Sequence, residues 1–310
     1  MSKTLLLIGA RGFAGSHLLD MAREAGLRVL AASREGTSDA LPCDLLDLAS
    51  VEACVEVAQP DLVVNAAGSP SVAASWERPD EALAVNARGV LNLLKAISDR
   101  APGAHLVCIS SAAVYAEPGA EQKPLTERDR LAPVSPYGVS KAEMEVACAR
   151  YVRELEMRIA IVRAFNLIGP GQPPFHSASG FARRIAEAEW AGDSAVELKL
   201  GNPGAARDFT DVRDAARGIV ELSRRECWGT FNLCSRRKTT IAELVAELAR
   251  QTRLQVNARR DPGLARPVDP TLLVGDPSRL REATGFEPAI PLSQSLADLL
   301  GWWRRRLAGA

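Results

Sequence analysis

The sequence predicts an α/β fold in which a doubly wound parallel β-sheet is followed by a smaller, partly interleaved α/β unit. Through the first half of the chain, short apolar runs alternate with amphipathic stretches of helical length. A glycine-rich turn joins the first run to the first amphipathic stretch. Strands that are separated by helices pair in parallel, because the intervening helix returns the chain to the same end of the sheet. The 310 residues can bury a large core in one domain or two.

The first half of the chain supplies the predicted sheet. Thr4–Ile8 is a short apolar run that ends at the glycine turn, and Phe13–Ala25 continues as an amphipathic helix. Ser50 can cap a helix over 50–59, because its hydroxyl can accept a hydrogen bond from the first turn. The other predicted elements are strands at 28–32, 61–67, 106–110 and 158–165 and helices at 80–99 and 140–156.

The pattern changes after residue 165, where proline and glycine cluster at 169–174 and the segments become shorter. We therefore expect a first domain over 1–165, to which the chain returns around 206–235, and a second domain made of 166–205 and 236–310. Helices are predicted at 181–191, 212–225, 241–252, 278–284 and 296–307, and short strands at 196–200 and 230–233.

Composition and charge exclude several classes of function. The 38 basic and 38 acidic residues cancel, so no overall field draws the chain to nucleic acid or to a membrane surface. Six cysteines without a Cys-x-x-Cys pair, with only three histidines, predict reduced thiols and no metal site. The chain opens directly on a strand and has no apolar run long enough to span a bilayer, so we expect a cytoplasmic protein.

The glycine turn is a candidate phosphate-binding element. Gly9, Gly12 and Gly15 stand between a strand and a helix, where glycine lets the backbone approach a ligand closely. The N-terminus of the following helix offers unpaired N–H groups to the pyrophosphate of a dinucleotide. Arg11 and Phe13, which lie within the turn, are further candidate cofactor contacts.

The second strand indicates which dinucleotide is bound. An acidic residue at its end would bind the adenosine ribose and select NAD. This chain has Ser33 and Arg34 instead, and a hydroxyl and a guanidinium suit a 2′-phosphate, to which Arg11 could also contribute. We therefore favour NADP(H) and keep NAD(H) as a possibility. Asp44, followed by Leu45, is placed to accept a hydrogen bond from the adenine amino group.

Small residues end the strand at 61–67. Ala66, Ala67 and Gly68 would let a cofactor lie against the backbone there. Asn86 stands in an otherwise apolar helical stretch, where a polar side chain needs a partner. It either contacts the ligand or braces the sheet, and the sequence favours neither.

Tyr137 and Lys141 are candidate catalytic residues. They are four residues apart, so on a helix they share a face and the ammonium can lie near the phenol. A nearby positive charge stabilises the phenolate, and we expect it to lower the tyrosine pKa toward neutrality. Ser111, at the carboxyl end of a strand, could hydrogen-bond the same substrate oxygen; Ser110 is the alternative, and only geometry separates the two.

Together these elements resemble the extended short-chain dehydrogenase/reductase superfamily over essentially the whole chain. Motifs in the carboxyl half narrow the resemblance to its nucleotide-sugar branch. They are R-A-F-N-L-I-G-P-G-Q at 163–172, R-D-F-T-D-V-R-D at 207–214, F-N-L-C-S at 231–235, R-P-V-D-P at 266–270 and G-D-P-S-R-L at 275–280.

The resemblance implies a Rossmann-type NAD(P)-binding domain and a catalytic triad of Ser111, Tyr137 and Lys141. The implied reaction is NAD(P)H-dependent reduction of the C4 ketone of a GDP-linked 6-deoxy-4-keto sugar, GDP-4-dehydro-6-deoxy-D-mannose, which gives GDP-D-rhamnose. Members commonly form homodimers through a four-helix bundle, to which 80–99 and 140–156 would contribute here.

The resemblance also assigns substrate contacts. It implies that Asn166 and Arg207 hold the substrate diphosphate and that Arg266 makes a second phosphate or ribose contact. Guanidinium groups suit this role because they pair bidentately with phosphate oxygens. Each arginine could instead belong to a structural ion pair.

Two departures from the family pattern bear on the reaction. Tyr115 is followed by Ala116 where relatives usually carry glycine, so the loop over the sugar is expected to differ. Ala112 and Ala113 stand near the position of the acidic pair of the 4,6-dehydratases, so dehydration is not expected. A 4-epimerase of the UDP-glucose type that retains NAD, and a 4-ketoreductase of another nucleotide sugar, remain alternatives. A non-enzymatic NADP-binding redox sensor is disfavoured because the serine, tyrosine and lysine are all present.

Overall fold

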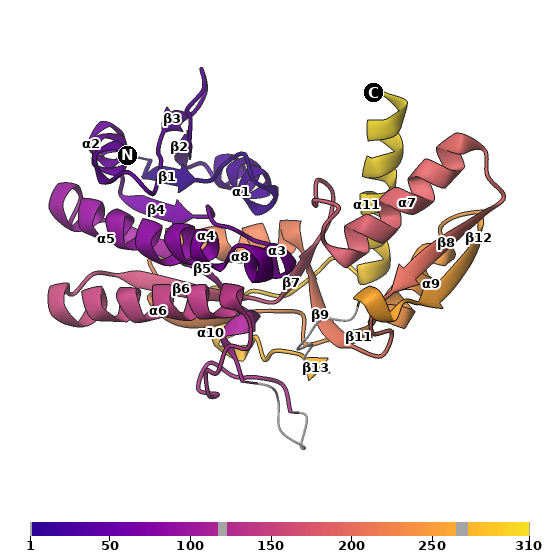
Figure 1. Cartoon of the computed structure of the whole chain (residues 1–310). Helices are drawn as coiled ribbons and strands as arrows, with labels where there is room; N and C mark the ends of the chain where they lie inside the picture. The colour runs from indigo at the N-terminus through magenta and orange to yellow at the C-terminus, as the bar shows by residue number, and fades with distance from the viewer. Residues whose placement is uncertain (1, 117–122, 265–271, 310) are drawn as a thin grey trace.

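The predicted doubly wound α/β architecture is confirmed by the computed structural model, which describes residues 2–116, 123–264 and 272–309. A seven-stranded parallel sheet with the strand order β10-β6-β5-β4-β1-β2-β3 forms the larger part of the molecule (Figure 1). Its strands are β1 Thr4–Ile8, β2 Arg28–Ser33, β3 Leu41–Pro42, β4 Leu62–Asn65, β5 His105–Ser111, β6 Ile159–Ala164 and β10 Gly229–Leu233.

The strand order reverses direction between β1 and β4. From β1 the chain first builds outward through β2 and β3, then crosses back to β4 on the other side of β1 and continues through β5 and β6. Ile8 pairs with Ala32 on one side and with Asn65 on the other, so these three strands end at the same edge. Open parallel sheets bind ligands at such a reversal, beyond the carboxyl ends of the strands.

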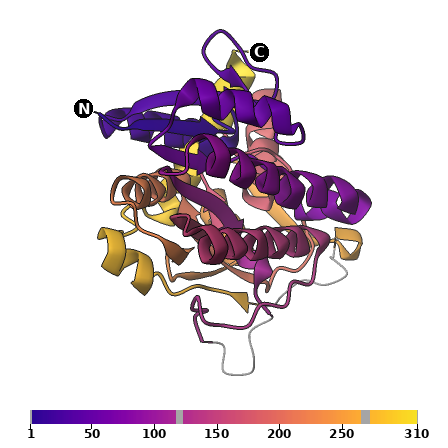
Figure 2. The ribbon, with the colours of Figure 1, turned by 90° about the vertical axis from the view of Figure 1, so that its left-hand side faces the viewer.

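Helices cover both faces of the sheet, and each layer buries its own apolar core. One layer holds α2 Leu48–Ala58, α5 Gly89–Arg100 and α6 Pro136–Leu155, and Figure 2 shows α5 and α6 running alongside each other. The opposite layer holds α1 Phe13–Glu24, α8 Val212–Arg224 and α10 Ser278–Thr284.

A second unit lies to one side of the large sheet (Figure 1). Its core lies among three helices, α7 Ser177–Ala191, α9 Ile241–Ala249 and α11 Leu292–Ala308, and the parallel pair of strands β8 Ala195–Leu200 and β12 Gln255–Arg260. A small sheet is formed by β7 Asn166–Ile168, β9 Ala206–Asp211, β11 Lys238–Thr240 and β13 Leu272–Leu273. Within the segment predicted to return to the first domain, α8 and β10 join the large sheet and its layer, whereas β9 belongs to the small sheet.

Four predicted helix starts were wrong: the helices predicted to begin at 50, 140, 181 and 296 begin at Leu48, Pro136, Ser177 and Leu292. The helix predicted over 50–59 begins at Leu48 and is capped by Asp47, whose carboxylate accepts from Ala49 N at 3.0 Å. Ser50 is not the cap; its Oγ accepts from the backbone N of Asp44 at 3.0 Å. The helix predicted over 140–156 begins at Pro136, and Ser135 caps it.

Other differences concern short or interrupted elements. The helix predicted over 80–99 is a continuous run of α4 Pro79–Leu83, a π-helical turn over Ala84–Arg88, and α5. The short helix α3 Val72–Glu77 and the strands β3, β7, β9, β11, β12 and β13 were not predicted. Among the described residues, no helix is long and apolar enough to cross a bilayer.

Candidate active site

The glycine turn joins β1 to α1 at the strand reversal. Gly9 has a φ of +81°, in the left-handed region that favours glycine. A Cβ on Gly9 would lie 2.6 Å from the backbone N of Ala67, at the end of β4. A Cβ on Gly15 would lie 2.0 Å from the carbonyl oxygen of Gly9. Both positions therefore require glycine, because the turn, α1 and the β4 end are in close backbone contact.

The N-terminus of α1 has the features of an anion-binding site. Gly12, at the N-cap, provides no side-chain cap, and the first turn contains no acidic residue. The uncapped N–H groups and the helix dipole favour a negatively charged group at this end. Arg11 is exposed next to it, and Phe13 is half-buried with its ring edge-on to that of His17 at 6.0 Å. The residues present thus fit the pyrophosphate of a dinucleotide.

The residues predicted to read the adenosine end lie along β2 and the segment after β3. Ser33 is half-buried at the end of β2, and Arg34 is exposed directly after it. Asp44 is half-buried, and its Oδ1 accepts from the backbone N of Leu46 at 2.9 Å. Leu45 is buried in the core next to α5, so its side chain packs rather than lines the surface.

The residues that follow β4 lie beside the glycine turn. Ala66 and Ala67 are half-buried, and Gly68 is exposed. Ala66 N donates to the carbonyl of Ile8 at 2.9 Å, which continues the β1–β4 ladder past the strand end. A Cβ on Gly68 would lie 2.7 Å from Oδ1 of Asn86, so this position also requires glycine.

Asn86 braces the fold. Its side chain is 1% exposed, in the π-helical turn between α4 and α5. Oδ1 accepts from the backbone N of Ser69 at 2.9 Å, while Nδ2 donates to the Ser69 carbonyl at 3.2 Å and to Oγ of Ser140 at 2.9 Å. These bonds tie the segment after β4 to α6. Of the two roles that the sequence left open for Asn86, the geometry favours the structural one.

Tyr137, Lys141 and Ser111 come together at the carboxyl end of β5. Tyr137 lies close enough to Ser111 for the serine side chain to lower the tyrosine pKa. Lys141 is 7% exposed, and its Nζ donates to the backbone carbonyl of Ile109, in β5, at 2.8 Å. Gly138 makes this approach possible, because a Cβ there would lie 2.4 Å from the carbonyl oxygen of Ala113. The first turn of α6 therefore lies directly against the turn that follows Ser111.

The structure separates the two serines. Ser110 is 2% exposed, and its Oγ donates to Oε1 of Glu145 at 2.5 Å inside the protein. Ser111 is half-buried, accepts from the backbone N of Ala113 at 3.2 Å and contacts Tyr137. Neighbouring residues of a strand point to opposite sides, which explains the division. Ser111 is therefore the serine that faces the candidate site.

The expected direction of the Tyr137 pKa shift was wrong. Burial raises the pKa of Tyr137 above its ordinary value, and the hydrogen bond with Ser111 opposes the rise only in part. The nearby ammonium does not reverse this, because Lys141 is itself buried and is bonded to a backbone carbonyl. Burial lowers the pKa of Lys141 to about 8.

The predicted substrate contacts lie on the small sheet. In the register of β7 against β9, Asn166 is opposite Phe209, and Arg207 is two residues before Phe209. Residues in register, and residues two apart on one strand, share a face, so Asn166 and Arg207 are on the same face of this sheet. Asn166 is exposed, whereas Arg207 is 8% exposed with Nη1 donating to the Ala206 carbonyl at 2.9 Å. Arg266 lies outside the described residues.

Sequence reasoning missed two supports of the site. Ser75, in the unpredicted helix α3, accepts from the backbone N of Tyr137 at 3.1 Å and so holds the first turn of α6. Glu145 and Arg163 form a buried ion pair beneath Ser110. Glu145 follows Lys141 at helical spacing, which is the one sequence signal that could have found it.

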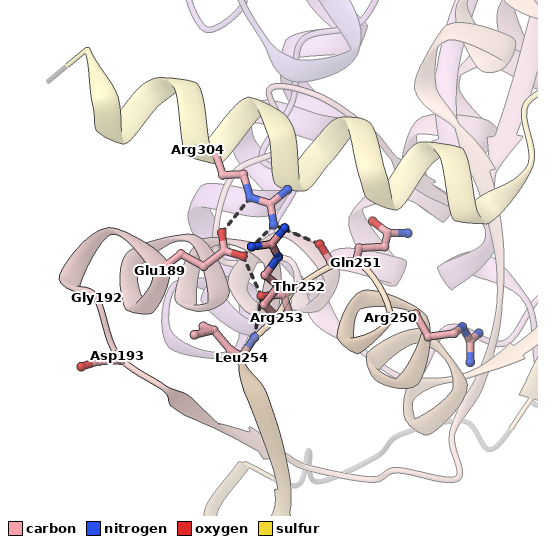
Figure 3. Close-up of a pocket in the computed structure, with 9 residues that line it drawn as sticks. All are labelled: Glu189, Gly192, Asp193, Arg250, Gln251, Thr252, Arg253, Leu254 and Arg304. Carbon is pink, nitrogen blue, oxygen red and sulfur yellow. Dashed lines mark hydrogen bonds and ion pairs between the residues drawn. The ribbon is translucent and has the colours of Figure 1, made fainter.

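A cavity of about 610 Å³ lies elsewhere, among α7, α9 and α11 (Figure 3). None of the predicted site residues that the structure describes lines it. Its central charges are already paired, since Arg304 donates to both carboxylate oxygens of Glu189, at 2.7 and 2.6 Å, and Thr252 donates to Glu189 at 2.6 Å (Figure 3).

A family model described as the NAD dependent epimerase/dehydratase family matches residues 5–255. The chain belongs to this family. It is 31% identical to GDP-6-deoxy-D-mannose reductase of Pseudomonas aeruginosa, over 99% of both chains. The predicted resemblance to the nucleotide-sugar branch of short-chain dehydrogenases/reductases is confirmed.

Solved structures show the same relationship. The structure of RMD from Pseudomonas aeruginosa complexed with NADPH matches with a TM-score of 0.88 and 30% identity, covering 98% of this chain and 100% of that one. The Thermus thermophilus UDP-glucose 4-epimerase in complex with NAD matches with a TM-score of 0.85 and 26% identity, covering 97% and 99%. The chain is thus similar over its whole length both to a protein solved with NADPH and to an epimerase solved with NAD.

Proposed function

We propose that this protein is a nucleotide-sugar 4-ketoreductase that reduces the C4 ketone of GDP-4-dehydro-6-deoxy-D-mannose to GDP-D-rhamnose. The observation that carries the proposal is that Tyr137 lies beside Ser111, at the carboxyl end of β5 and next to buried Lys141. The full-length similarity to GDP-6-deoxy-D-mannose reductase supports the choice of substrate.

NADP(H) is the cofactor that we propose. The cradle of Gly9 and Gly15 and the uncapped N-terminus of α1 would hold the pyrophosphate, and Ser33 and Arg34 would face the 2′-phosphate. Bound NADPH would supply the hydride for the C4 carbon. The NADPH complex of the Pseudomonas aeruginosa relative supports this choice over NAD.

Tyr137 is proposed as the proton donor. Reduction adds one hydride to the carbonyl carbon and one proton to its oxygen, so the reacting tyrosine must begin protonated. Burial raises the Tyr137 pKa, which keeps the phenol in that form at neutral pH. Ser111 would donate a hydrogen bond that orients the same oxygen, and the Lys141 ammonium would stabilise the phenolate left after transfer. Tyr137 would then regain a proton from solvent.

The substrate diphosphate is assigned to the small sheet. Asn166 and Arg207 would bind it from the face that they share, and Arg266 would add a further contact. Ala112 and Ala113 bring only methyl groups to the turn after Ser111, so the acid–base step of dehydration is not part of the proposal.

A homodimer through α5 and α6 is proposed as the working form. Apolar side chains stand exposed along the outer side of these helices, with Leu91 at 41%, Val139 at 37% and Val146 at 70% exposure. Val139 and Val146 are seven residues apart, so they share one stripe of α6. Two copies that pair these helices would bury the stripe in a four-helix bundle.

The decisive experiment follows NADPH oxidation with GDP-4-dehydro-6-deoxy-D-mannose, made by a separate dehydratase, and identifies the product by NMR. Formation of GDP-D-rhamnose is expected. Turnover with only a UDP- or dTDP-linked ketone would move the activity to another nucleotide sugar. Tightly held NAD with interconversion of UDP-sugars, and no net NADPH oxidation, would overturn the proposal in favour of a 4-epimerase.

Variants then test the assigned roles. Tyr137→Phe should lower kcat by about 10²-fold or more while NADPH affinity changes little, because only the transferable proton is removed. Tyr151→Phe, on the same helix, is the matched control and should be as active as the wild type. Arg34→Ala should weaken NADPH binding without weakening NADH binding; equal losses for both cofactors would remove Arg34 from the 2′-phosphate site.

A further inference from the structure

A buried ionic network lies directly beneath the candidate site. Arg163, in β6, and Glu145, in α6, form an ion pair in which Nη2 and Oε2 are 2.7 Å apart, and each side chain is 6% exposed. Arg163 Nε also donates to both oxygens of Glu145, at 3.1 Å each. Ser110 donates to the same carboxylate at 2.5 Å. One carboxylate therefore joins β5, β6 and α6.

The network continues into the segment that follows Ser111. Nη1 of Arg163 donates to the hydroxyl of Tyr115 at 3.0 Å, and the guanidinium lies 4.8 Å from the centre of the tyrosine ring. The Tyr115 hydroxyl donates in turn to Oδ1 of Asn232, in β10, at 2.6 Å. Asn232 is fully buried, and its Nδ2 donates to the carbonyl of Leu125 at 2.8 Å.

The position of Glu145 couples it to the reacting groups. Tyr137, Lys141 and Glu145 follow one another at intervals of four residues in α6, so they lie along one side of the helix. Ser110 immediately precedes Ser111 in β5. The Glu145 carboxylate thus ties the catalytic side of α6 to the strand residue next to the reacting serine.

Stability alone does not account for such a pair. Removing two charges from water costs several kcal/mol for each ion, and apolar residues of similar volume are often as stable or more so. What a fully bonded carboxylate adds is direction, because each of its partners is held at one distance and angle. At the site, a displacement of about 1 Å between reacting groups can cost about 10²-fold in rate.

We propose that Glu145 is a positioning residue, which acts through Ser110 and Arg163 to hold the Tyr137–Lys141 side of α6 in register with Ser111. The proposal rests on the proposed reductase function and assigns Glu145 no contact with substrate or cofactor. It requires that loosening the link between Glu145 and Ser110 lowers the rate of the chemical step more than it changes cofactor binding.

Ser110→Ala tests the link most cleanly, because it removes one hydrogen bond and leaves the ion pair of Glu145 and Arg163 intact. We expect kcat to fall about tenfold or more, with KM for NADPH changed less than about twofold. Asp214→Asn is the matched control. The Asp214 carboxylate is fully buried in α8, where it accepts from Ala289 N and Ile290 N at 2.8 Å. This variant should lower thermal stability and leave kcat unchanged.

Glu145→Gln adds a readout that a purely structural role would not move. The ionisable groups that act on Lys141 are Cys108 from β5 and Glu145 and Cys148 from its own helix, and the carboxylate raises the lysine pKa. Without that charge, and with the Arg163 charge left in place, the Lys141 pKa should fall further. The alkaline limb of the kcat profile should therefore move to lower pH. An unmoved limb with wild-type kcat in both Ser110→Ala and Glu145→Gln would overturn the proposal.

A substrate-independent measurement separates this proposal from the reductase assignment. The chain has three tyrosines, so the ring signal of Tyr137 can be assigned in ¹³C-tyrosine-labelled protein by comparison with Tyr137→Phe. Ser110→Ala should shift that signal and its titration, while Asp214→Asn should not. An unchanged signal in Ser110→Ala would overturn the positioning role, whichever sugar nucleotide the wild type reduces.

Discussion

Replacing Gly15 with alanine should damage the protein although alanine is the better helix former. Gly15 lies in the first turn of α1, where helix propensity alone would favour alanine by about 0.8–1 kcal/mol. Against this, the added Cβ would lie 2.0 Å from the carbonyl oxygen and 2.8 Å from the carbonyl carbon of Gly9. Ordinary contacts between such atoms are about 3.5–4.0 Å. Both atoms are backbone, so no side chain can rotate away and α1 must move off the turn.

The size of the effect follows from that displacement. Overpacking of a tight contact costs about 1–3 kcal/mol, and the opposing propensity term recovers at most about 1 kcal/mol. The difference is about 0–2 kcal/mol, and the 2.0 Å contact with backbone places the net loss near the upper end, about 2 kcal/mol, with a Tm lower by a few degrees. NADPH affinity should fall about tenfold or more, because the N–H groups at the start of α1 move away from the pyrophosphate. Thermal denaturation and a fluorescence titration with NADPH measure the two effects.

Two other glycines calibrate the result. A Cβ on Gly12 would lie 3.3 Å from the same Gly9 oxygen, so Gly12→Ala should be milder than Gly15→Ala. A Cβ on Gly103 would meet nothing within 4 Å, so Gly103→Ala should leave both Tm and NADPH affinity at wild-type values. If Gly15→Ala retains wild-type stability and affinity, the close contact between α1 and the turn does not exist and the proposed cradle is refuted.

Three further predictions concern the site and its surroundings. Because the Lys141 pKa lies near 8 and the cationic form is lost as pH rises, kcat/KM for NADPH should decline above about pH 8, and a flat profile to pH 10 would contradict the assigned role. Asn86→Ala should destabilise the fold by about 1–3 kcal/mol in chemical denaturation, because the half-buried N–H of Ser69 loses its acceptor and the buried Oγ of Ser140 loses a donor; an unchanged midpoint would show that the brace is dispensable. Val146→Arg should convert a dimer to monomers in light scattering, while a mass that matches the wild-type dimer would exclude α6 from the interface.

Local patterns in the sequence predicted six of the seven strands of the large sheet, all but the two-residue β3, and the helices that cover the sheet. Thr4–Ile8 is a strand over the predicted range. A short apolar run that ends at a glycine can be predicted as a strand from neighbouring residues alone. Ser278–Thr284 is likewise a helix over the predicted range. Errors appeared where two local signals compete. Asp47 and Ser50 are both residue types that favour the N-cap position. In the structure the helix begins at Leu48, so Asp47 is the N-cap.

The small sheet could not be predicted, because its strands carry no alternating pattern. All six residues of β9 are buried, including Arg207, Asp208 and Asp211. A run of six residues with three charges would instead be predicted to be a surface loop. Its partners are distant in sequence, since β11 and β13 pair with it from opposite sides and β7 pairs farther along it. Asp208 remains buried because it accepts from the backbone N of Ser235, Arg236 and Gly275.

The two serines at the end of β5 show how one local rule sets up both halves of the proposed mechanism. Because side chains alternate along a strand, Ser110 and Ser111 cannot both face the reacting groups. Ser110 points inward to Glu145, and Ser111 is left for Tyr137. Both partners lie on α6, eight residues apart. Glu145 therefore fixes the helix to β5, while Tyr137 is placed beside Ser111, where the two would act on the substrate together. Interchanging the two roles would require a one-residue slip of β5 against its neighbours, which would turn Cys108 and Ser110 out of the core. The same register that buries the core therefore also determines which serine can act.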